Sequence, residues 1–474
     1  MMKRRTFVAQ AGIVAAGLAL NKNFAFAQSA ELPAVRIPAG QRKFTSKAIE
    51  QAIAEFSANV KNKELVWLFN NCFPNTLDTT VNFSMKDGRP DTYVITGDID
   101  AMWLRDSTAQ VYPYLGFVKQ DPELKHLVAG VINHQTQCIL KDPYANAFYN
   151  DPTKVGEWAH DVTKMQPGIH ERKWEIDSLC YPIRLAHKYW KETGDTSPFD
   201  AQWREAIILT HKTFKEQQRK TGDGPYSFQR KTSWATDGVP LGGYGYPVNP
   251  VGLICSTFRP SDDATIFSFL IPSNFFAVVS LKQAAEMATA IYKDEPLAVH
   301  LTSLATEVEA ALKKYATVTH EKYGRVYAYE VNGFGSFNLM DDANVPSLIS
   351  LPYLGAVSAS AAIYENTRKM LLSADNPFFY KGTAGEGIGG PHAGKNMIWP
   401  LGITMRGLTS NNDKEIRQCL EMLKASNAGT GFMHESFNKD DAKKFTRKWF
   451  AWANTLFGEF LWKIYKEKPH LLAM

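Results

Sequence analysis

The residues with the clearest capacity for chemistry are carboxylates that lie among arginine and aromatic side chains. The first such segment is residues 96–107 (TGDIDAMWLRDS), in which Trp103, Arg105 and Asp106 are close neighbours. Carboxylates in this setting can bind a polar ligand or exchange protons with it. An acid at the start of a helix also stabilises that helix, by about 0.3–1 kcal/mol. The segment therefore fits both helix capping and ligand binding.

Two further segments hold candidates for a pair of proton-transfer groups. Residues 258–264 (FRPSDDA) contain Asp262 and Asp263, and residues 429–438 (GTGFMHESFN) contain Glu435 between two Phe residues. A carboxyl in an apolar wall has a raised pKa and can donate a proton, while an ionised one can accept it. Purely structural explanations remain open, because Pro-Ser-Asp-Asp is a good helix start and a loop glutamate is usually solvated.

A fourth group mixes tryptophan with carboxylates and amides, in WEID at 174–177 and KNMIWP at 395–400. An aromatic ring stacks on the apolar face of a sugar, while acids and amides bond its hydroxyls. A single tryptophan is more often a core residue, but four such segments together indicate a carbohydrate site. The candidate binding residues are Trp103, Arg105, Asp106, Trp174, Glu175, Asp177, Arg259, Trp399 and His434.

The elements that must position these residues are mainly helices. Ile49, Ile53 and Phe56 recur at spacings of three and four after a candidate cap at Ser46, which predicts a first helix. Similar patterns recur at 101–119, 122–141, 174–193, 198–220, 273–293, 295–315, 351–374, 395–408, 413–427 and 446–467. The patterns predict about eleven or twelve helices, with short β-rich runs at 92–96 and 325–331.

Recurring helices without strong self-similarity fit antiparallel pairs that close into a ring. An α-solenoid would show a readable repeat consensus and short turns. The connections at 221–262, 380–400 and 428–445 are instead long and rich in Trp, Tyr, His, Gly and Asp, as expected around the mouth of a toroid. We predict an all-α toroid with minor β-hairpins, formed by one domain at 45–474 after a lead segment at 28–44.

Composition and motifs exclude several other classes. The 474 residues are 45% hydrophobic and 21% charged, which fits a globular protein and not a disordered one. No zinc motif, phosphate-binding loop or GxSxG elbow is present, so we expect no metal and no cofactor. The five cysteines are far apart and are expected to be mostly buried thiols.

The first 27 residues have the pattern of an export signal. Arg4 and Arg5 precede a weakly apolar stretch, and Ala25-Phe26-Ala27 offers a small-x-small cleavage site. The paired arginines resemble the twin-arginine signal, so we expect a periplasmic or other extracytoplasmic protein that is not inserted in the membrane after cleavage. Without the four basic residues of this segment the net charge falls from +5 to +1, which removes the electrostatic argument for nucleic-acid binding.

The four segments, GDIDAMWLRDS, KWEIDS, FRPSDDA and GFMHESF, resemble in this order glycoside hydrolase family 125, the metal-independent exo-α-1,6-mannosidases. The resemblance covers about residues 45–467. It implies an (α/α)6 barrel, inversion at the anomeric carbon, and a terminal mannose held by Arg105 and Asp106. It places the general base at Glu435 and the general acid at Asp262 or Asp263. The acid loops of other inverting (α/α)6 glycosidases favour Asp262.

From these features we predict an exported, inverting exo-α-1,6-mannosidase that acts on mannose-containing oligosaccharides or glycans. Another inverting (α/α)6 exo-glycosidase, such as an α-glucosidase, would use the same pair of carboxylates on a different sugar. A non-catalytic glycan-binding toroid would show a surface aromatic platform without converging acids. A lyase or epimerase of the same fold would need a Tyr or His base beside an arginine.

Overall fold

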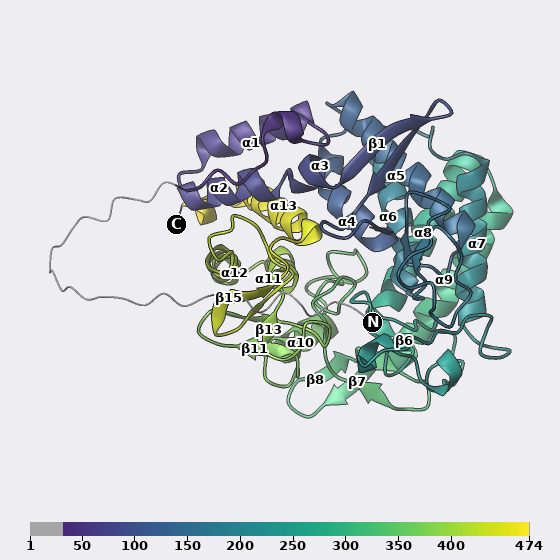
Figure 1. Ribbon diagram of the computed structural model, residues 1–474. Coiled ribbons are helices and arrows are strands. Elements are labelled where there is room, and N and C mark those ends of the chain that lie inside the picture. The colour runs from purple at the N-terminus through teal and green to yellow at the C-terminus, as the bar shows by residue number, and fades with distance from the viewer. Residues whose placement is uncertain (1–31, 474) are drawn as a thin grey trace, which may run out of the picture. The chain divides into compact units, whose positions relative to one another are not determined.

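The computed structural model describes residues 32–473, and Val35–Met474 cluster as one unit of packed helices. Five helices line its interior and contact one another in the order α8, α6, α4, α13 and α11 (Figure 1). Their bounds are α4 Leu104–Val111, α6 Ile176–Thr193, α8 Ile271–Met287, α11 Pro400–Leu408 and α13 Ala451–Glu467. Buried turns at 347–355 lie in the chain between α8 and α11, where a sixth inner helix would be expected.

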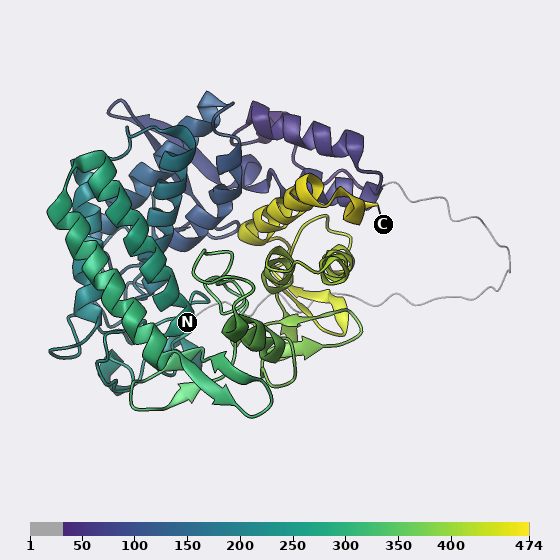
Figure 2. The ribbon, with the colours of Figure 1, turned by 180° about the vertical axis from the view of Figure 1, so that it is seen from behind.

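A second set of helices packs outside the first, as the view from behind shows for α7 and α9 (Figure 2). The contacts pair α5 with α6, α9 with α8, α12 with α11, and α2 with α13. The bounds of this set and of the short α3 are α1 Lys47–Asn59, α2 Lys63–Cys72, α3 Asn75–Thr79, α5 Pro122–Lys141, α7 Ala201–Gln217, α9 Glu295–Tyr315, α10 Ala362–Leu371 and α12 Asp413–Ser426. The all-α toroid with paired helices is confirmed.

The predicted helix positions are correct except in two regions. Ser46 caps α1 through its hydroxyl, which accepts a hydrogen bond from the Ile49 amide at 3.2 Å. The region after α1 holds α2 and α3, for which no helix was predicted. The expected helix at 351–374 is wrong for its first half, because Pro352 and Gly355 break the chain into turns before α10 begins.

Short strands precede the inner helices and bring the loops to one end of them. β3 leads into α4, β5 into α6, β6 into α8, β13 into α11 and β15 into α13. They form the sheets β3-β4-β5, β10-β9-β6 and β13-β14-β15, beside the hairpins β1-β2, β7-β8 and β11-β12. The bounds are β1 Val81–Lys86, β2 Arg89–Val94, β3 Met102–Trp103, β4 Ala147–Phe148, β5 Ile169–Glu171, β6 Phe269–Leu270, β7 Thr317–His320, β8 Gly324–Tyr327, β9 Glu330–Val331, β10 Phe337–Asn338, β11 Phe379–Lys381, β12 Glu386–Ile388, β13 Met397–Ile398, β14 Ser436–Asn438 and β15 Asp441–Thr446.

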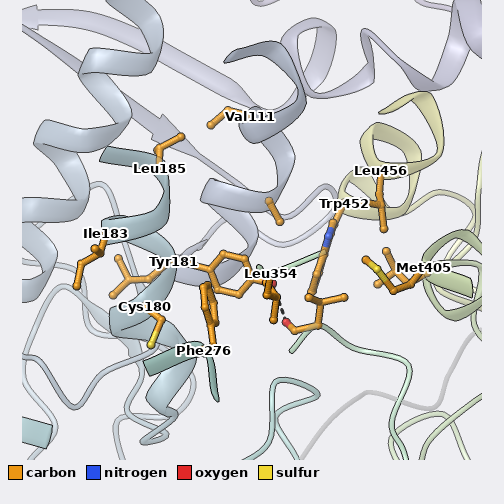
Figure 3. Close-up of a cluster of buried hydrophobic side chains, with 14 of the residues drawn as sticks. Val111, Cys180, Tyr181, Ile183, Leu185, Phe276, Leu354, Met405, Trp452 and Leu456 are labelled. Carbon is orange, nitrogen blue, oxygen red and sulfur yellow. Dashed lines mark hydrogen bonds between the residues drawn. The ribbon is translucent and has the colours of Figure 1, made fainter. Parts of the chain in front are cut away.

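The interior of the ring is filled with side chains from these inner helices (Figure 3). Tyr181 packs edge-on against Phe276 with ring centroids 5.0 Å apart, and its hydroxyl donates to the Val345 carbonyl at 2.7 Å. The ring closes where α13 meets the segment before α4, through a 2.8 Å bond between Thr455 and Thr76. The site must therefore lie at the end of this packed interior and not in a channel through it.

The five cysteines are all free and buried, as expected. Among residues 32–473, no helix is both long and apolar enough to cross a bilayer. The expected signal peptide at 1–27 lies outside the described residues.

Candidate active site

The buried guanidinium of Arg105 joins the first turns of two inner helices. Arg105 lies in the first turn of α4, and its Nη1 donates to Glu175, at the N-cap of α6, at 2.5 Å. The same nitrogen is 3.4 Å from Asp177 in the first turn of α6, and Nε is 3.6 Å from the neighbouring Asp106. Helix N-termini carry partial positive charge, so acids are favourable in these positions. None of these acids makes a side-chain cap hydrogen bond to α4 or α6, and Glu175 and Asp177 bond Arg105 instead.

Three of the carboxyls around Arg105 have raised pKa values. Burial raises the pKa of Asp106 and that of Asp177 to about 6, although the charge of Arg105 opposes both shifts. Burial also raises the pKa of Glu175 well above its ordinary value. The cluster therefore exchanges protons near neutral pH, which suits a site where a proton is delivered to a substrate.

Asp262 reaches this cluster from a tight turn between Phe258 and Ala264, which pair as an antiparallel bridge. The Asp262 amide donates to the Arg259 carbonyl at 2.9 Å, and the Asp262 backbone is left-handed with φ of 65°. This conformation costs an L-residue roughly 1–2 kcal/mol, although Asp tolerates it better than most. The carboxyl Oδ1 accepts bonds from Arg105 at 3.0 Å and from Asn146 at 3.4 Å.

Asp263, the alternative acid, has a different environment. Its side chain is 1% exposed, compared with 22% for Asp262. It accepts from the Ser261 hydroxyl at 3.2 Å and lies 3.6 Å from His392. Burial alone would raise the pKa of Asp263, but the hydrogen bond and charge of His392 hold it below its ordinary value. The carboxyl of Asp262 is the more accessible of the two to a ligand, so the geometry favours Asp262 as the acid.

His392 connects this turn to the loop that carries Glu435. Burial alone would lower the pKa of His392, but Asp263, with further contributions from Glu435 and Asp262, raises it to about 9. The imidazole is therefore cationic at neutral pH and lies within electrostatic reach of both candidate proton-transfer groups. His392 could not be identified from the sequence, since a lone histidine after Gly-Gly-Pro carries no chemical signature.

Glu435 is anchored by an arginine that also binds the first segment. Arg447 Nη1 is 3.4 Å from the Glu435 carboxylate, and its Nη2 donates to the Thr96 carbonyl at 2.8 Å and to Asp98. The Glu435 side chain is 13% exposed. Asp106 lies within electrostatic reach of Asp262, in the turn at 258–264 (the acid turn), and of Arg447, which anchors Glu435 in the loop at 429–438 (the base loop). Segments that are far apart in the sequence therefore converge on one site.

All nine predicted sugar-binding residues have relative exposures of 5% or less. Five of them lie outside the carboxyl cluster around Arg105: Trp103, Trp174, Arg259, Trp399 and His434. The Trp174 indole donates to the Cys255 carbonyl at 2.7 Å, Arg259 pairs with Glu330 at 2.7 Å, and His434 stacks on Phe445 with centroids 3.7 Å apart. These three hold the loops in place and are not sugar platforms. Trp399 lies edge-on to His392 at 6.1 Å and so borders the site.

Arg105 itself is only 3% exposed, and three of its four carboxyl neighbours are among the predicted substrate-binding residues. Arg105 positions Asp262 through a 3.0 Å contact, and direct binding of the sugar by Arg105 stays a prediction. Three further residues hold the acid turn and the base loop but could not be identified from the sequence: Asn146, Lys173 and Arg447. Within residues 32–473, no group of three or more His, Cys, Asp or Glu side chains is arranged to hold a metal ion.

Similarity to known proteins agrees with this geometry. Residues 62–462 match the family model of metal-independent α-mannosidases, glycoside hydrolase family 125. The meiotically up-regulated gene 157 protein of Schizosaccharomyces pombe is 42% identical over 463 residues, which cover 93% of this chain and 90% of that protein.

Two solved structures are similar to this chain, one in both sequence and fold and the other in fold alone. A metal-independent α-mannosidase of Streptococcus pneumoniae, in a non-productive complex with α-1,6-mannobiose, is 39% identical with a TM-score of 0.86, over 90% of this chain and 100% of that one. A bacterial glucoamylase complexed with acarbose is 14% identical with a TM-score of 0.55, over 88% of this chain and 59% of that one, and supports the fold alone. The chain belongs to glycoside hydrolase family 125, the metal-independent α-mannosidases.

Proposed function

We propose that this α-mannosidase removes terminal α-1,6-linked mannose from oligosaccharides or glycans, one residue at a time and with inversion. The observation that carries the proposal is the convergence of the Asp262 turn and the Glu435 loop on the carboxyl cluster around Arg105. The linkage is supported by the α-1,6-mannobiose complex of the Streptococcus pneumoniae relative.

In this mechanism Asp262 donates a proton to the glycosidic oxygen as the bond to the anomeric carbon breaks. Glu435 removes a proton from a water that attacks the opposite face of the ring, and the transition state resembles an oxocarbenium ion. An inverting pair needs room for that water, which sets the carboxyl separation at roughly 6.5–9.5 Å. Asp106, beside Arg105, is the proposed acceptor of a hydroxyl of the terminal mannose.

A panel of disaccharides tests linkage, stereochemistry and metal together. The enzyme should hydrolyse α-1,6-mannobiose, leave α-1,2- and α-1,3-mannobiose essentially intact, and release β-mannose first, as followed by proton NMR. Excess EDTA should leave the rate unchanged, because two carboxyls supply both proton transfers.

An identically purified Glu435→Gln protein controls for contaminating mannosidases in this panel. Equal rates on the three linkages would contradict the proposed specificity. Release of α-mannose first would contradict inversion, and loss of activity in EDTA that one metal restores would overturn the metal-free mechanism.

We further propose that the protein is exported through the twin-arginine route, on the basis of Arg4-Arg5 before a weakly apolar segment. Replacing both arginines by lysine should leave unprocessed precursor in the cytoplasm, measured by cell fractionation and N-terminal sequencing. A Lys22→Arg change, which keeps the charge of the leader, is the matched control. Undiminished export of the double variant would contradict the proposed route.

A further inference from the structure

Lys173 has a buried ammonium group directly behind the turn that carries Asp262. Its side chain is 2% exposed, and Nζ donates to the Asp262 main-chain carbonyl and to the Asp237 carboxylate, each at 2.8 Å. The same nitrogen is 3.4 Å from Glu171. A buried ammonium is costly unless it is paired, and these partners satisfy its three N–H groups.

Lys173 also reaches the carboxyl of Asp262 through a second residue. The Lys173 main-chain amide donates to Asn146 Oδ1 at 3.0 Å, and Asn146 Nδ2 lies 3.4 Å from Asp262 Oδ1. One residue therefore holds Asp262 at both ends, the carbonyl through its ammonium and the carboxyl through the Asn146 side chain.

The backbone conformation of Asp262 explains why the turn needs both contacts. Its left-handed φ of 65° is intrinsically unfavourable for a residue with a Cβ, and such conformations persist only where the surroundings fix them. Rotation of the Asp262 backbone to a right-handed conformation would turn both the carbonyl away from Lys173 and the carboxyl away from the site.

We propose that Lys173 is a positioning residue for proton donation, which holds the Asp262 turn in the conformation that aims its carboxyl at the glycosidic oxygen. The proposal rests on the proposed role of Asp262 as the general acid. A purely structural role for Lys173, the neutralisation of Glu171 and Asp237, is the alternative that the test must exclude.

The dependence of rate on the leaving group separates the two roles. A sugar alcohol leaves slowly unless it is protonated, whereas 2,4-dinitrophenolate leaves without a proton. Lys173→Met should therefore lower kcat on α-1,6-mannobiose by about 10- to 100-fold, a part of the effect of general acid catalysis. On 2,4-dinitrophenyl α-mannoside the same variant should lose less than about 3-fold.

A double-mutant cycle adds a second readout. Since Lys173 acts through Asp262, Lys173→Met should have no further effect on mannobiose hydrolysis once Asp262→Asn is present. Arg230→Met is the matched control, because Arg230 is an equally buried cation that binds Asp161 at 2.6 Å. It shares Glu171 and Asp237 with Lys173, at 2.9 and 3.8 Å, but does not bond Asp262. Any loss in that control should be equal for the two substrates.

Equal losses on both substrates for Lys173→Met, or additive effects with Asp262→Asn, would overturn the proposal. If Lys173→Met fails to fold, Asn146→Ala removes the other half of the hold and faces the same two-substrate criterion. If Asp262→Asn itself slows hydrolysis of both substrates equally, Asp262 is not the general acid. That result would contradict the proposed function and not the contacts of Lys173 with the turn.

Discussion

Asp262→Asn should retain its fold and lose about 10²–10⁴-fold of kcat on α-1,6-mannobiose, while keeping most of its rate on 2,4-dinitrophenyl α-mannoside. The amide keeps the acceptor oxygen that faces Arg105 and tolerates the left-handed backbone, but it cannot donate the proton. Glu435→Gln should lose activity on both substrates, because water attack needs a base whatever the leaving group is.

Azide provides a separate test of Glu435 as the general base. Azide is already a nucleophile and needs no base, so it should restore cleavage of the dinitrophenyl substrate by Glu435→Gln and give β-mannosyl azide. Asp100→Asn, in the same segment as Arg105 but with a side chain that is 73% exposed, controls for nonspecific effects and should change kcat by less than about 2-fold. Restoration with an α-configured product, or full activity of either amide variant, would contradict the proposed pair.

Arg105→Met should be the most destabilising single change around the site. Removing one partner of a buried ion pair costs about 3–5 kcal/mol, because the remaining charges stay buried without compensation. Four carboxyls, from Asp106, Glu175, Asp177 and Asp262, would lose their common cation. Urea unfolding should show this loss, and mannobiose hydrolysis should fall as well because Asp262 loses its anchor.

The destabilisation caused by Arg105→Met should depend on pH. The raised pKa values of Asp106 and Asp177, about 6, mean that the folded state binds these protons more tightly than the unfolded chain. The stability they contribute is present at low pH and is lost as the pH rises through about 6, and without Arg105 the loss should be larger. Arg105→Met should therefore be less destabilised at pH 5 than at pH 8.

Arg204→Met provides the comparison for Arg105→Met. Arg204 pairs with Asp294 at 2.5 Å, but its side chain is 41% exposed, and exposed pairs contribute only about 0–1 kcal/mol. A small, pH-independent effect is expected there. Similar unfolding midpoints for the two variants at pH 8 would show that the carboxyl cluster does not depend on Arg105.

The helical ring could be predicted from sequence because its helices are long and strongly periodic. α5 was predicted at its observed bounds, 122–141, and Ser46 was recognised as the cap of α1. The short strands before the inner helices could not be predicted, because a run of two or three residues has no readable alternation. The turns at 347–355 were missed because their apolar residues imitate a helix period.

The site was predictable as a set of segments but not as a set of contacts. Acid pairs and aromatic neighbours identified the four segments, yet Asp262 and Asp263 differ only in the direction that the turn gives each side chain. The burial of Trp174 could not be predicted, because the sequence does not show which side of a loop faces the core. Lys173 and Arg447 were missed because their roles depend on partners such as Asp262 and Asp98, which are distant in sequence.

The closure of the ring between α13 and the segment before α4 determines the order in which the site can be assembled. Thr76 bonds Thr455 and Asn75 bonds Asn454, in each case across 379 residues of sequence. Contacts between such distant residues require closure of a long loop, which costs entropy and slows folding. The base loop lies immediately before α13, so a partly folded chain that already contains α4, α6 and the Asp262 turn still lacks the group that activates water. The proposed pair of proton-transfer groups is therefore complete only in a chain whose ring has closed.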